Sequence, residues 1–299
     1  MTKILNFGSL NIDNVYKVNH FVQPGETIAA LSFDLLPGGK GLNQSVALAK
    51  AGANVYHAGK IGLDGKWLID ILDNAGVHTE LIDQTGTTTG MAAIQVNRSG
   101  QNCIIINHGA NAEITDDYID YVLDHFQKGD ILLLQNEINS ISRIVDKAFD
   151  LGMKIALNPS PMDKSVLNCS LEKITYFILN EIEGGSLTGE KKPNQIASAL
   201  LKSYPEAKIV LTLGKGGVLY QDKKISCVHG IYKVPVVDTT GAGDTFTGFF
   251  LACVNQYPIE EALQIASIAS SIEVSRKGAS IAIPTLDEVK NSSLEVQQQ

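Results

Sequence analysis

The stretch VDTTGAGDTFTGFF, residues 237–250, places an acidic residue where a glycine-rich turn runs into a helical pattern. The first N–H groups of a helix have no partner within the helix and carry partial positive charge. The backbone at Gly241, Ala242 and Gly243 could therefore hold phosphate oxygens, because glycine lets the chain approach an anion closely. Asp244 would then sit beside the reacting phosphorus and could accept the proton of an attacking hydroxyl. The alternative is a first-turn acid that is favoured only by the helix dipole, after an ordinary tight turn.

A second set of polar side chains follows the first apolar stretch of the chain, in GSLNID at residues 8–13. Asn11 and Asp13 lie two residues apart, so their side chains share a face if the backbone is extended. A carboxylate that accepts from two hydroxyls, beside an amide that both donates and accepts, suits a polyol substrate. The alternative is a strand that ends in an Asx turn without any ligand.

Glycines also cluster in PGGKGLNQS, residues 37–45, directly before a helical pattern. Gly38, Gly39 and Gly41 permit tight backbone that a ligand can approach, although an ordinary connecting loop would also use them. The stretch is not a P-loop, because no Ser or Thr follows Lys40 and the upstream glycine is missing.

Two further loops follow buried apolar stretches. Asn180 and Glu183, in LNEIEGG, lie three apart at an expected helix start and therefore face the same side. Glu183 could reach Mg²⁺ through water, because Mg²⁺ keeps much of its hydration shell. A helix-capping arrangement is the alternative. TLGKGG, residues 212–217, could wrap the ribose or phosphates of a nucleotide, or could form only a hairpin turn.

The composition limits the class of partner. The 299 residues carry 24 Lys and Arg against 32 Asp and Glu, a formal charge of −8, which argues against general binding to nucleic acids or anionic membranes. The four cysteines lie far apart without a C-x-x-C pair, which favours buried reduced thiols over disulfides or zinc. The N-terminus lacks the apolar core of a signal peptide, and no apolar stretch approaches a membrane span. We therefore predict a cytoplasmic protein.

Apolar stretches that suit strands alternate with helical patterns along most of the chain. This βαβ alternation predicts one α/β domain in which a parallel sheet is covered by helices. Expected strands cover 4–9, 54–62, 130–137, 154–161, 174–181 and 208–217, and expected helices cover 41–52, 65–76, 116–126, 140–151, 243–255 and 259–275. Segment 16–21 is a further expected strand. Segment 27–36 and a hairpin over 87–109 are expected to form a small antiparallel sheet beside the main one.

Taken in order and nearly end to end, these stretches resemble the ribokinase, or PfkB, family of carbohydrate kinases. Any single motif is weak, but the ordered set is specific. The matching motifs are NID (11–13), PGET (24–27), GGKGLNQS (38–45), HGANAEIT (108–115), NPSP (158–161), LNEIE (179–183), TLGKGG (212–217), DTTGAGDTF (238–246) and RKGA (276–279). Within the family, PGET, GGKGLNQ and HGANA resemble ribokinases more than fructokinases or adenosine kinases.

The resemblance implies a single kinase domain over residues 1–299, built as a three-layer α/β/α sandwich with a small β-sheet lid. The lid strands would be inserted at roughly 14–37 and 86–108. The implied reaction is ATP-dependent phosphorylation of the primary hydroxyl, O5, of D-ribose, giving ribose 5-phosphate and ADP.

The motif residues match the family's site by position. Those that match the catalytic base and its anion hole are Asp244 and Gly241, Ala242 and Gly243. Those that match sugar-binding positions are Asn11, Asp13, Gly39, Lys40, Gly41, Asn43, Glu137 and Asp244. Those that match nucleotide-binding positions are Asn180, Thr212, Leu213, Gly214, Lys215, Gly216, Gly217, Gly243 and Ser267.

The resemblance also implies two cation sites. Glu183 matches the residue that holds Mg²⁺ through water, and K⁺ would lie beside the anion hole as an activator. The matching residues for K⁺ are Asp238 and Thr240 and, mainly through the backbone, Glu273, Arg276 and Gly278. The chain departs from the family pattern here, because Ala282 stands where a serine ligand is common and Glu273 replaces a small residue.

In this family the lid covers the sugar and often packs against its copy in a homodimer. An apolar face expected on segment 27–36 suits such a partner. Two alternatives stay open. The first is a sister kinase that accepts deoxyribose, fructose or adenosine. The second is a sugar-binding regulator without the chemistry, which the intact Asp244, Glu183 and glycines argue against.

Overall fold

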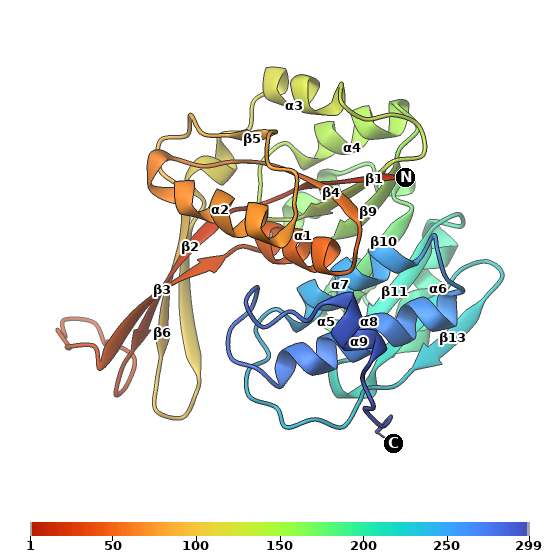
Figure 1. Ribbon diagram of the computed structural model, residues 1–299. Helices are drawn as coiled ribbons and strands as arrows, with labels where there is room; N and C mark the ends of the chain where they lie inside the picture. The colour runs from red at the N-terminus through yellow and green to blue at the C-terminus, as the bar shows by residue number, and fades with distance from the viewer. Residues whose placement is uncertain (1, 298–299) are drawn as a thin grey trace.

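The centre of the molecule is a nine-stranded sheet with the order β13-β12-β11-β10-β9-β8-β1-β4-β5 (Figure 1). We use a computed structural model and describe residues 2–297 of the chain. The parallel strands are β1 (Lys3–Phe7), β4 (Asn54–Lys60), β5 (Ile82–Asp83), β8 (Ile131–Gln135), β9 (Lys154–Asn158), β10 (Tyr176–Asn180) and β11 (Lys208–Thr212). An antiparallel hairpin of β12 (Val218–Gln221) and β13 (Ser226–His229) completes the sheet. The parallel strands therefore all end at one edge, where open α/β folds place their ligand sites.

The strands are buried on both faces, because successive side chains enter two separate apolar cores. In β1, Ile4 packs into one core, whereas Leu5 and Phe7 pack into the other. β8 repeats the pattern, with Leu133 on the first side and Leu132 on the second.

Helices cover both faces of this sheet, which makes three layers (Figure 1). The first core lies under α1 (Lys40–Lys50), α2 (Lys66–Ala75), α7 (Ala242–Cys253), α8 (Ile259–Val274) and α9 (Leu286–Lys290). The second lies under α3 (Asp116–Leu123), α4 (Ile141–Asp150), α5 (Glu181–Thr188) and α6 (Pro193–Ser203). Short 3₁₀ turns are η1 (Leu63–Gly65), η2 (Gly109–Ala112), η3 (Lys164–Asn168), η4 (Leu171–Lys173) and η5 (Gly214–Gly216). The predicted α/β/α sandwich is confirmed.

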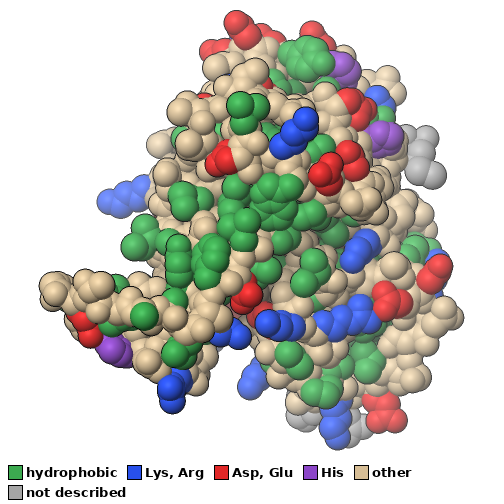
Figure 2. Space-filling model, turned by 60° about the vertical axis from the view of Figure 1, so that its left-hand side comes forward, with side chains coloured by type: hydrophobic (Ala, Val, Ile, Leu, Met, Phe, Trp, Pro, Cys, Tyr) green, Lys and Arg blue, Asp and Glu red, His purple; other side chains and the backbone are tan. Residues whose placement is uncertain are grey.

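A second, four-stranded sheet projects from the main body, at the left of Figure 1. Its strands, in spatial order, are β3 (Ser32–Gly38), β2 (Asn11–Lys17), β6 (Gly90–Val96) and β7 (Asn102–Asn107). Large apolar side chains on this sheet stay exposed, including Phe33 (50%), Leu35 (50%) and Ile105 (69%). Figure 2 shows hydrophobic side chains gathered on the face from which the small sheet projects. An apolar surface therefore accompanies this sheet, as predicted for segment 27–36.

Two predicted strands of the small sheet have different bounds in the structure. The strand predicted over 16–21 is wrong beyond Lys17, because β2 begins at Asn11 and pairs with β3 and β6 from there outward. Only the part of segment 27–36 from Ser32 onward is a strand. Helices α6 and α9 have no counterpart among the sequence predictions. Within residues 2–297, no helix combines the length and apolar composition that crossing a bilayer requires.

Candidate active site

The turn before α7 has the geometry of an anion-binding helix start. Gly241 takes a φ of +95°, a left-handed conformation that favours glycine. The first helical hydrogen bond of α7 runs from the Thr245 N–H to the Gly241 carbonyl at 2.8 Å. The N–H groups of Gly243 and Asp244 therefore precede the helical ladder and can serve an anion.

Asp244 lies in the first turn of α7 and is only 6% exposed. One carboxylate oxygen accepts from Gln44 Nε2 at 2.8 Å, and the other accepts from Asn43 Nδ2 at 3.1 Å. Both donors belong to α1, which packs against α7. The two amides thus fix the orientation of the carboxylate and leave further lone pairs for a substrate hydroxyl.

Gln44 is a site residue that the sequence analysis does not single out. Its Oε1 accepts from Gln135 Nε2 at 2.6 Å, and its Nε2 also donates to Asn158 Oδ1 at 3.0 Å. These partners orient the amide, so that its oxygen faces Gln135 and its nitrogen faces Asp244. A usable signal exists in the sequence, since Gln135 and Asn158 are amides at the ends of parallel strands.

Lys40 and Glu137 form the next part of the site. Glu137 follows β8 and accepts hydrogen bonds from the backbone N–H of Lys40 at 2.9 Å and from the Ser9 hydroxyl. Burial raises the pKa of Glu137 above its ordinary value, although the Lys40 charge opposes this. The charge of Asp244 is the main cause that raises the pKa of Lys40, against the effect of burial, and Glu137 and Glu183 add to it. Lys40 therefore stays cationic where a phosphate would bring further negative charge.

Asn11 and Asp13 lie at the root of the small sheet, on one face of β2. The Oδ1 of Asn11 accepts from Asn111 Nδ2 at 2.7 Å. The carboxylate of Asp13 lies against Gly38, where a Cβ would stand 2.2 Å from both carboxylate oxygens, so a larger residue would displace it. Burial, and then the charge of Glu137, raises the pKa of Asp13 to about 6. The two acids predicted to contact the sugar are therefore close enough to interact.

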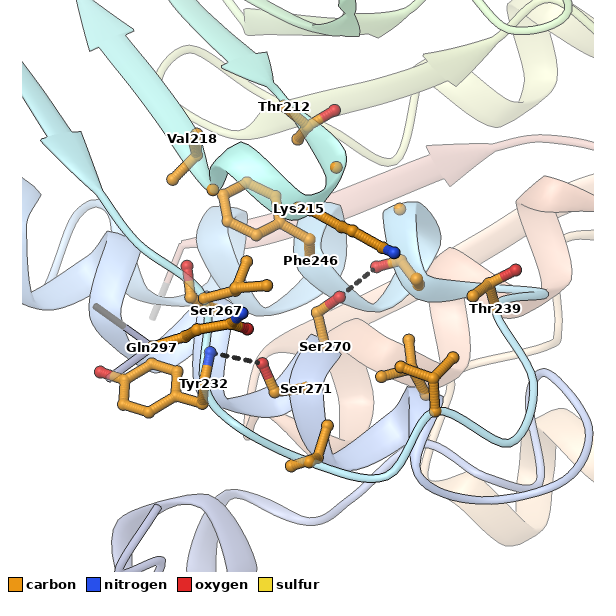
Figure 3. Close-up of a pocket in the computed structure, with 18 residues that line it drawn as sticks. Thr212, Lys215, Val218, Tyr232, Thr239, Phe246, Ser267, Ser270, Ser271 and Gln297 are labelled. Atoms are coloured by element: carbon orange, nitrogen blue, oxygen red, sulfur yellow. Dashed lines mark hydrogen bonds between the residues drawn. The ribbon is translucent and has the colours of Figure 1, made fainter. Parts of the chain in front are cut away.

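Two cavities meet at the start of α7. The larger has a volume of about 480 Å³, and Figure 3 shows Thr212 and Val218 on one side of it and Ser267 and Ser270 on another. Ligand pockets commonly span about 300–1,000 Å³, so this cavity has room for a nucleotide. The smaller cavity, of about 200 Å³, is lined by Lys40 and Asp244 among others. The residues that line both cavities are Thr212, Thr239 and Gly243.

Most of the predicted nucleotide-binding residues line these two cavities. Those on the larger cavity are Thr212, Gly214, Lys215, Gly217, Gly243 and Ser267, and Asn180 lies on the smaller one. Leu213 and Gly216 line neither cavity in the described part of the chain. The Leu213 N–H instead donates to the Gly217 carbonyl at 2.8 Å, and its carbonyl accepts from the Gly216 N–H at 2.9 Å. The hydrogen bonds of Leu213 and Gly216 therefore hold the turn in shape, and the other residues of the turn line the cavity.

Asn180 and Glu183 form the capping box that the sequence analysis gives as their alternative role. Asn180 Oδ1 accepts from the N–H groups of Ile182 and Glu183, both at 2.9 Å. In return, Glu183 Oε2 accepts from the Asn180 N–H at 2.9 Å. Both residues also line the smaller cavity. Asn180 and Glu183 therefore cap α5 and at the same time line the cavity in which the phosphates would lie.

The residues matched to the K⁺ site lie together beside the turn of residues 241–243, which we call the anion turn. The Asp238 carboxylate accepts from the N–H of Thr240 at 3.0 Å and from the N–H of Gly278 at 3.1 Å. It thereby joins the loop before α7 to the turn after α8. Burial, and then the charges of Asp238 and Asp244, raise the pKa of Glu273 to about 8. A cation at this place would relieve the repulsion between these acids.

The motifs that meet at this site also recur in known proteins. The family model described as pfkB family carbohydrate kinase matches residues 1–286. The chain belongs to the PfkB family of carbohydrate kinases. A ribokinase of Bacillus subtilis (strain 168) is 36% identical to this PfkB kinase over 296 residues, which cover 97% of this chain and 99% of that protein.

Other relatives include an enzyme named for a different sugar. A deoxyribokinase of Salmonella typhi is 29% identical over 291 residues, which cover 94% of this chain and 95% of that protein. The solved structure of Arabidopsis thaliana ribokinase complexed with ribose and ATP has a TM-score of 0.85 and 32% identity, and the match covers 97% of each chain. Because these matches span nearly the whole PfkB kinase, they include both of its sheets.

Proposed function

We propose that this PfkB kinase transfers the terminal phosphoryl group of ATP to O5 of D-ribose, giving ribose 5-phosphate and ADP. The observation that carries the proposal is the position of Asp244, in the wall of a small cavity that joins a nucleotide-sized one at Gly243. The smaller cavity also contains Lys40, whose backbone N–H is bound by Glu137. A similar protein of the same fold is known as a complex with ribose and ATP.

The nucleotide would occupy the larger cavity, with its base toward Ser267 and its phosphates along the turn of residues 212–217. The terminal phosphate would then lie at the boundary of the two cavities, against the N–H groups of Gly243 and Asp244. These donors face the oxygens on which negative charge accumulates during transfer, and they need no rearrangement as the reaction proceeds.

The sugar would lie between Asp13, Glu137 and Asp244, with O5 against the Asp244 carboxylate. Asp244 takes the O5 proton as the O5–phosphorus bond forms and the bond from phosphorus to the ADP oxygen breaks. In a loose transition state the proton leaves late, so a weak base that is well oriented is sufficient. Asn43 and Gln44 supply that orientation through their hydrogen bonds to the carboxylate.

Two cations belong to the proposal. Glu183 would hold Mg²⁺ through water, and K⁺ would lie beside the anion turn, between the Asp238 carboxylate and the backbone of residues 273–278. The fit rests on the buried carboxyl of Glu273, for which no hydrogen-bond partner exists in the described part of the chain. When bound, such ions neutralise charge that builds on the phosphate oxygens.

A coupled assay of ADP release across a small sugar panel tests the activity. D-Ribose is expected to give the highest kcat/KM, because its hydroxyls satisfy both Asp13 and Glu137. A sugar that lacks a hydroxyl leaves a buried acceptor unpaired, which costs about 1–3 kcal/mol, or roughly 5- to 150-fold. A higher kcat/KM on 2-deoxyribose, fructose or adenosine would assign the chain to a sister kinase. Tight ribose binding without ADP release would instead indicate a regulator.

The raised pKa of Asp13 predicts an acid limb in the pH profile. A protonated Asp13 cannot accept from two sugar hydroxyls, so kcat/KM for ribose is expected to fall about tenfold per pH unit below about 6. Asp13→Asn should lower kcat/KM at pH 7.5 and remove this limb. Asp222→Asn, at the end of β12, is the control and should keep the wild-type profile. An unchanged limb in Asp13→Asn would exclude Asp13 as its source.

The raised pKa of Asp13 also predicts how the stability of the fold depends on pH. A carboxyl whose pKa is higher in the folded state makes the fold less stable as the pH rises from its unfolded pKa to its folded pKa. Asp13→Asn should therefore unfold at a higher temperature than the wild type above pH 6, and this advantage should disappear as the pH falls toward 3.8. The gain is at most about 3 kcal/mol, since one pKa unit corresponds to about 1.4 kcal/mol. Thermal unfolding at pH 4 and pH 7.5 measures it.

The small sheet would act as a lid over the sugar and pair with its copy in a cytoplasmic homodimer. Exposed apolar residues such as Ile105 support this assignment. Ile105→Lys is expected to convert the dimer to a monomer in light scattering and sedimentation. Val228→Lys, on β13 at the far edge of the main sheet and 62% exposed, is the control and should remain dimeric. A wild-type monomer would contradict the proposal.

A further inference from the structure

Glu273 carries a buried carboxyl group that has neither a hydrogen-bond donor nor a positive charge beside it in the described part of the chain. It lies near the end of α8, and its exposed fraction is 0%. Neither of its carboxyl oxygens has a hydrogen-bond partner within residues 2–297. Burial of an ionised carboxylate without donors or an opposite charge costs several kcal/mol or more. A buried acid in this state either keeps its proton or has a positive group beside it.

Within the described part of the chain, the side chains around Glu273 do not supply that group. The two residues whose charges act on it are Asp238 and Asp244, and both are acids. Arg276, only three residues away, is committed elsewhere, because its Nη2 donates to Glu288 at 2.6 Å and its Nη1 donates to a backbone carbonyl at 3.4 Å.

The Glu273 carboxyl faces the anion turn. Its Oε1 lies 3.2 Å from the place where a Cβ on Gly241 would stand. The loop before α7 is also hydrogen-bonded to the end of α8, because the N–H groups of Val237 and Asp238 donate to the Val274 carbonyl at 2.8 and 3.2 Å. Glu273 and Asp238 therefore lie on two segments that are joined side by side, next to the turn that would hold the phosphate.

We propose that the Glu273 carboxylate is a direct ligand of a hard cation at this place, so that the site has two anionic side-chain ligands, Asp238 and Glu273. The inference rests on the cation site of the proposed function and adds a ligand that the family pattern lacks, since a small residue is usual at position 273. Each oxygen of the Asp238 carboxylate accepts from a backbone N–H, and the lone pairs that these bonds do not use can bind a cation. Alkali and alkaline-earth ions prefer such oxygen ligands, and added ligand charge increases their affinity.

The second carboxylate also accounts for Ala282. This residue is 1% exposed and has no side-chain oxygen, where ribokinases commonly offer a serine hydroxyl. A charged oxygen from Glu273 replaces that neutral one. The bound cation, in turn, removes the cost of burying Glu273 beside two other acids.

Thermal unfolding in cation-defined buffers tests this inference without using activity. The melting temperature is followed in choline chloride while K⁺, Na⁺ or Ca²⁺ replaces choline at constant ionic strength. At least one of these ions should raise the melting temperature of the wild type, and the ion with the lowest midpoint concentration is the natural occupant. In Glu273→Ala and Glu273→Gln this midpoint should increase at least about tenfold, because loss of even an outer partner of a metal ligand commonly costs about 10–100-fold in affinity.

Two comparisons distinguish direct binding of the cation from the loss of a negative charge and from a change in packing. Glu261→Ala removes the same charge from an exposed position of the same helix and should keep the wild-type midpoint. In choline alone at pH 9, where the Glu273 carboxyl is ionised, Glu273→Gln should unfold at a higher temperature than the wild type, because a buried amide costs less than an uncompensated carboxylate. This advantage should shrink as the cation saturates the wild type, whereas a packing role would give the same difference in every buffer.

The inference is overturned if no cation stabilises the wild type more than choline, or if both Glu273 variants keep its midpoint. ADP release with ribose at saturating salt is measured in parallel. Activity with an unshifted midpoint rejects the Glu273 ligand alone. A shifted midpoint without any kinase activity rejects the proposed function and leaves the cation site in place.

Discussion

Asp244→Asn is expected to lower kcat with ribose by about 10²–10⁴, because general base catalysis commonly contributes that much. Ribose binding should largely survive, since Asp13 and Glu137 remain. The new amide would meet the donors of Asn43 and Gln44, so some loss of stability, about 1–3 kcal/mol, is also expected. Single-turnover kinetics, calorimetric titration with ribose and thermal unfolding measure the three quantities separately.

The control for Asp244→Asn is a first-turn acid that lies outside the site. Asp117 is exposed in the first turn of α3, so Asp117→Asn removes a comparable interaction with a helix dipole. This variant should keep the wild-type kcat. If Asp244→Asn phosphorylates ribose as fast as the parent enzyme does, Asp244 is only a helix-start acid and its role as base is wrong.

Gly243→Ala should separate activity from stability. A Cβ on Gly243 would meet no described atom within 4 Å outside its chain neighbours and the backbone of its own helix, and the residue lines both cavities. The methyl group would enter the space between the cavities without disturbing the fold. We expect kcat/KM to fall at least about 10²-fold, similar to the loss of an oxyanion donor. Stability should stay equal or rise by up to about 1 kcal/mol, because alanine favours a helix over glycine.

Two other glycines provide the contrast. Gly241→Ala should lose both activity and stability, because its φ is +95° and its Cβ would lie 3.0 Å from the Cβ of Ala279. Gly76→Ala carries a similar strain, about 1–2 kcal/mol, at φ +89° after α2, where nothing crowds a Cβ. It should lose stability alone. Full activity in Gly243→Ala would show that the phosphate does not pass this turn.

The local parts of the site follow from the sequence because their chemistry depends on neighbours in the chain. A glycine turn that leads into a helix, with Asp244 in the first turn, needs only residues 241–245. The polar residues at strand ends follow from the change between apolar and polar stretches, which predicts Asn180 and the turn at 212–217. The two roles considered for Asn180 and Glu183 are not exclusive, because one side chain can cap a helix and line a cavity.

Contacts between distant segments could not be predicted in this way. Gln44 lies 200 residues from Asp244 in the chain, and Asn111 lies 100 residues from Asn11. The strand-end amides Gln135 and Asn158 are a signal that polar groups gather at this edge, but no local pattern places Gln44 or Asn111 beside its partner. The bounds of β2 also depend on distant partners, because pairing with β3 and β6 decides where the strand begins.

The sequence alone determined the layered α/β architecture, the anion turn and the types of side chain available for sugar and phosphate, because periodicity and glycine placement act over a few residues. The tertiary structure decided which of these groups meet. Parallel strands buried on both faces bring their carboxyl ends to one edge, and the packing of α1 against α7 then sets Asn43 and Gln44 on Asp244. The tertiary structure also leaves the Glu273 carboxyl without a donor among residues 2–297, since a partner for a buried charge is a property of the assembled core and not of any one segment.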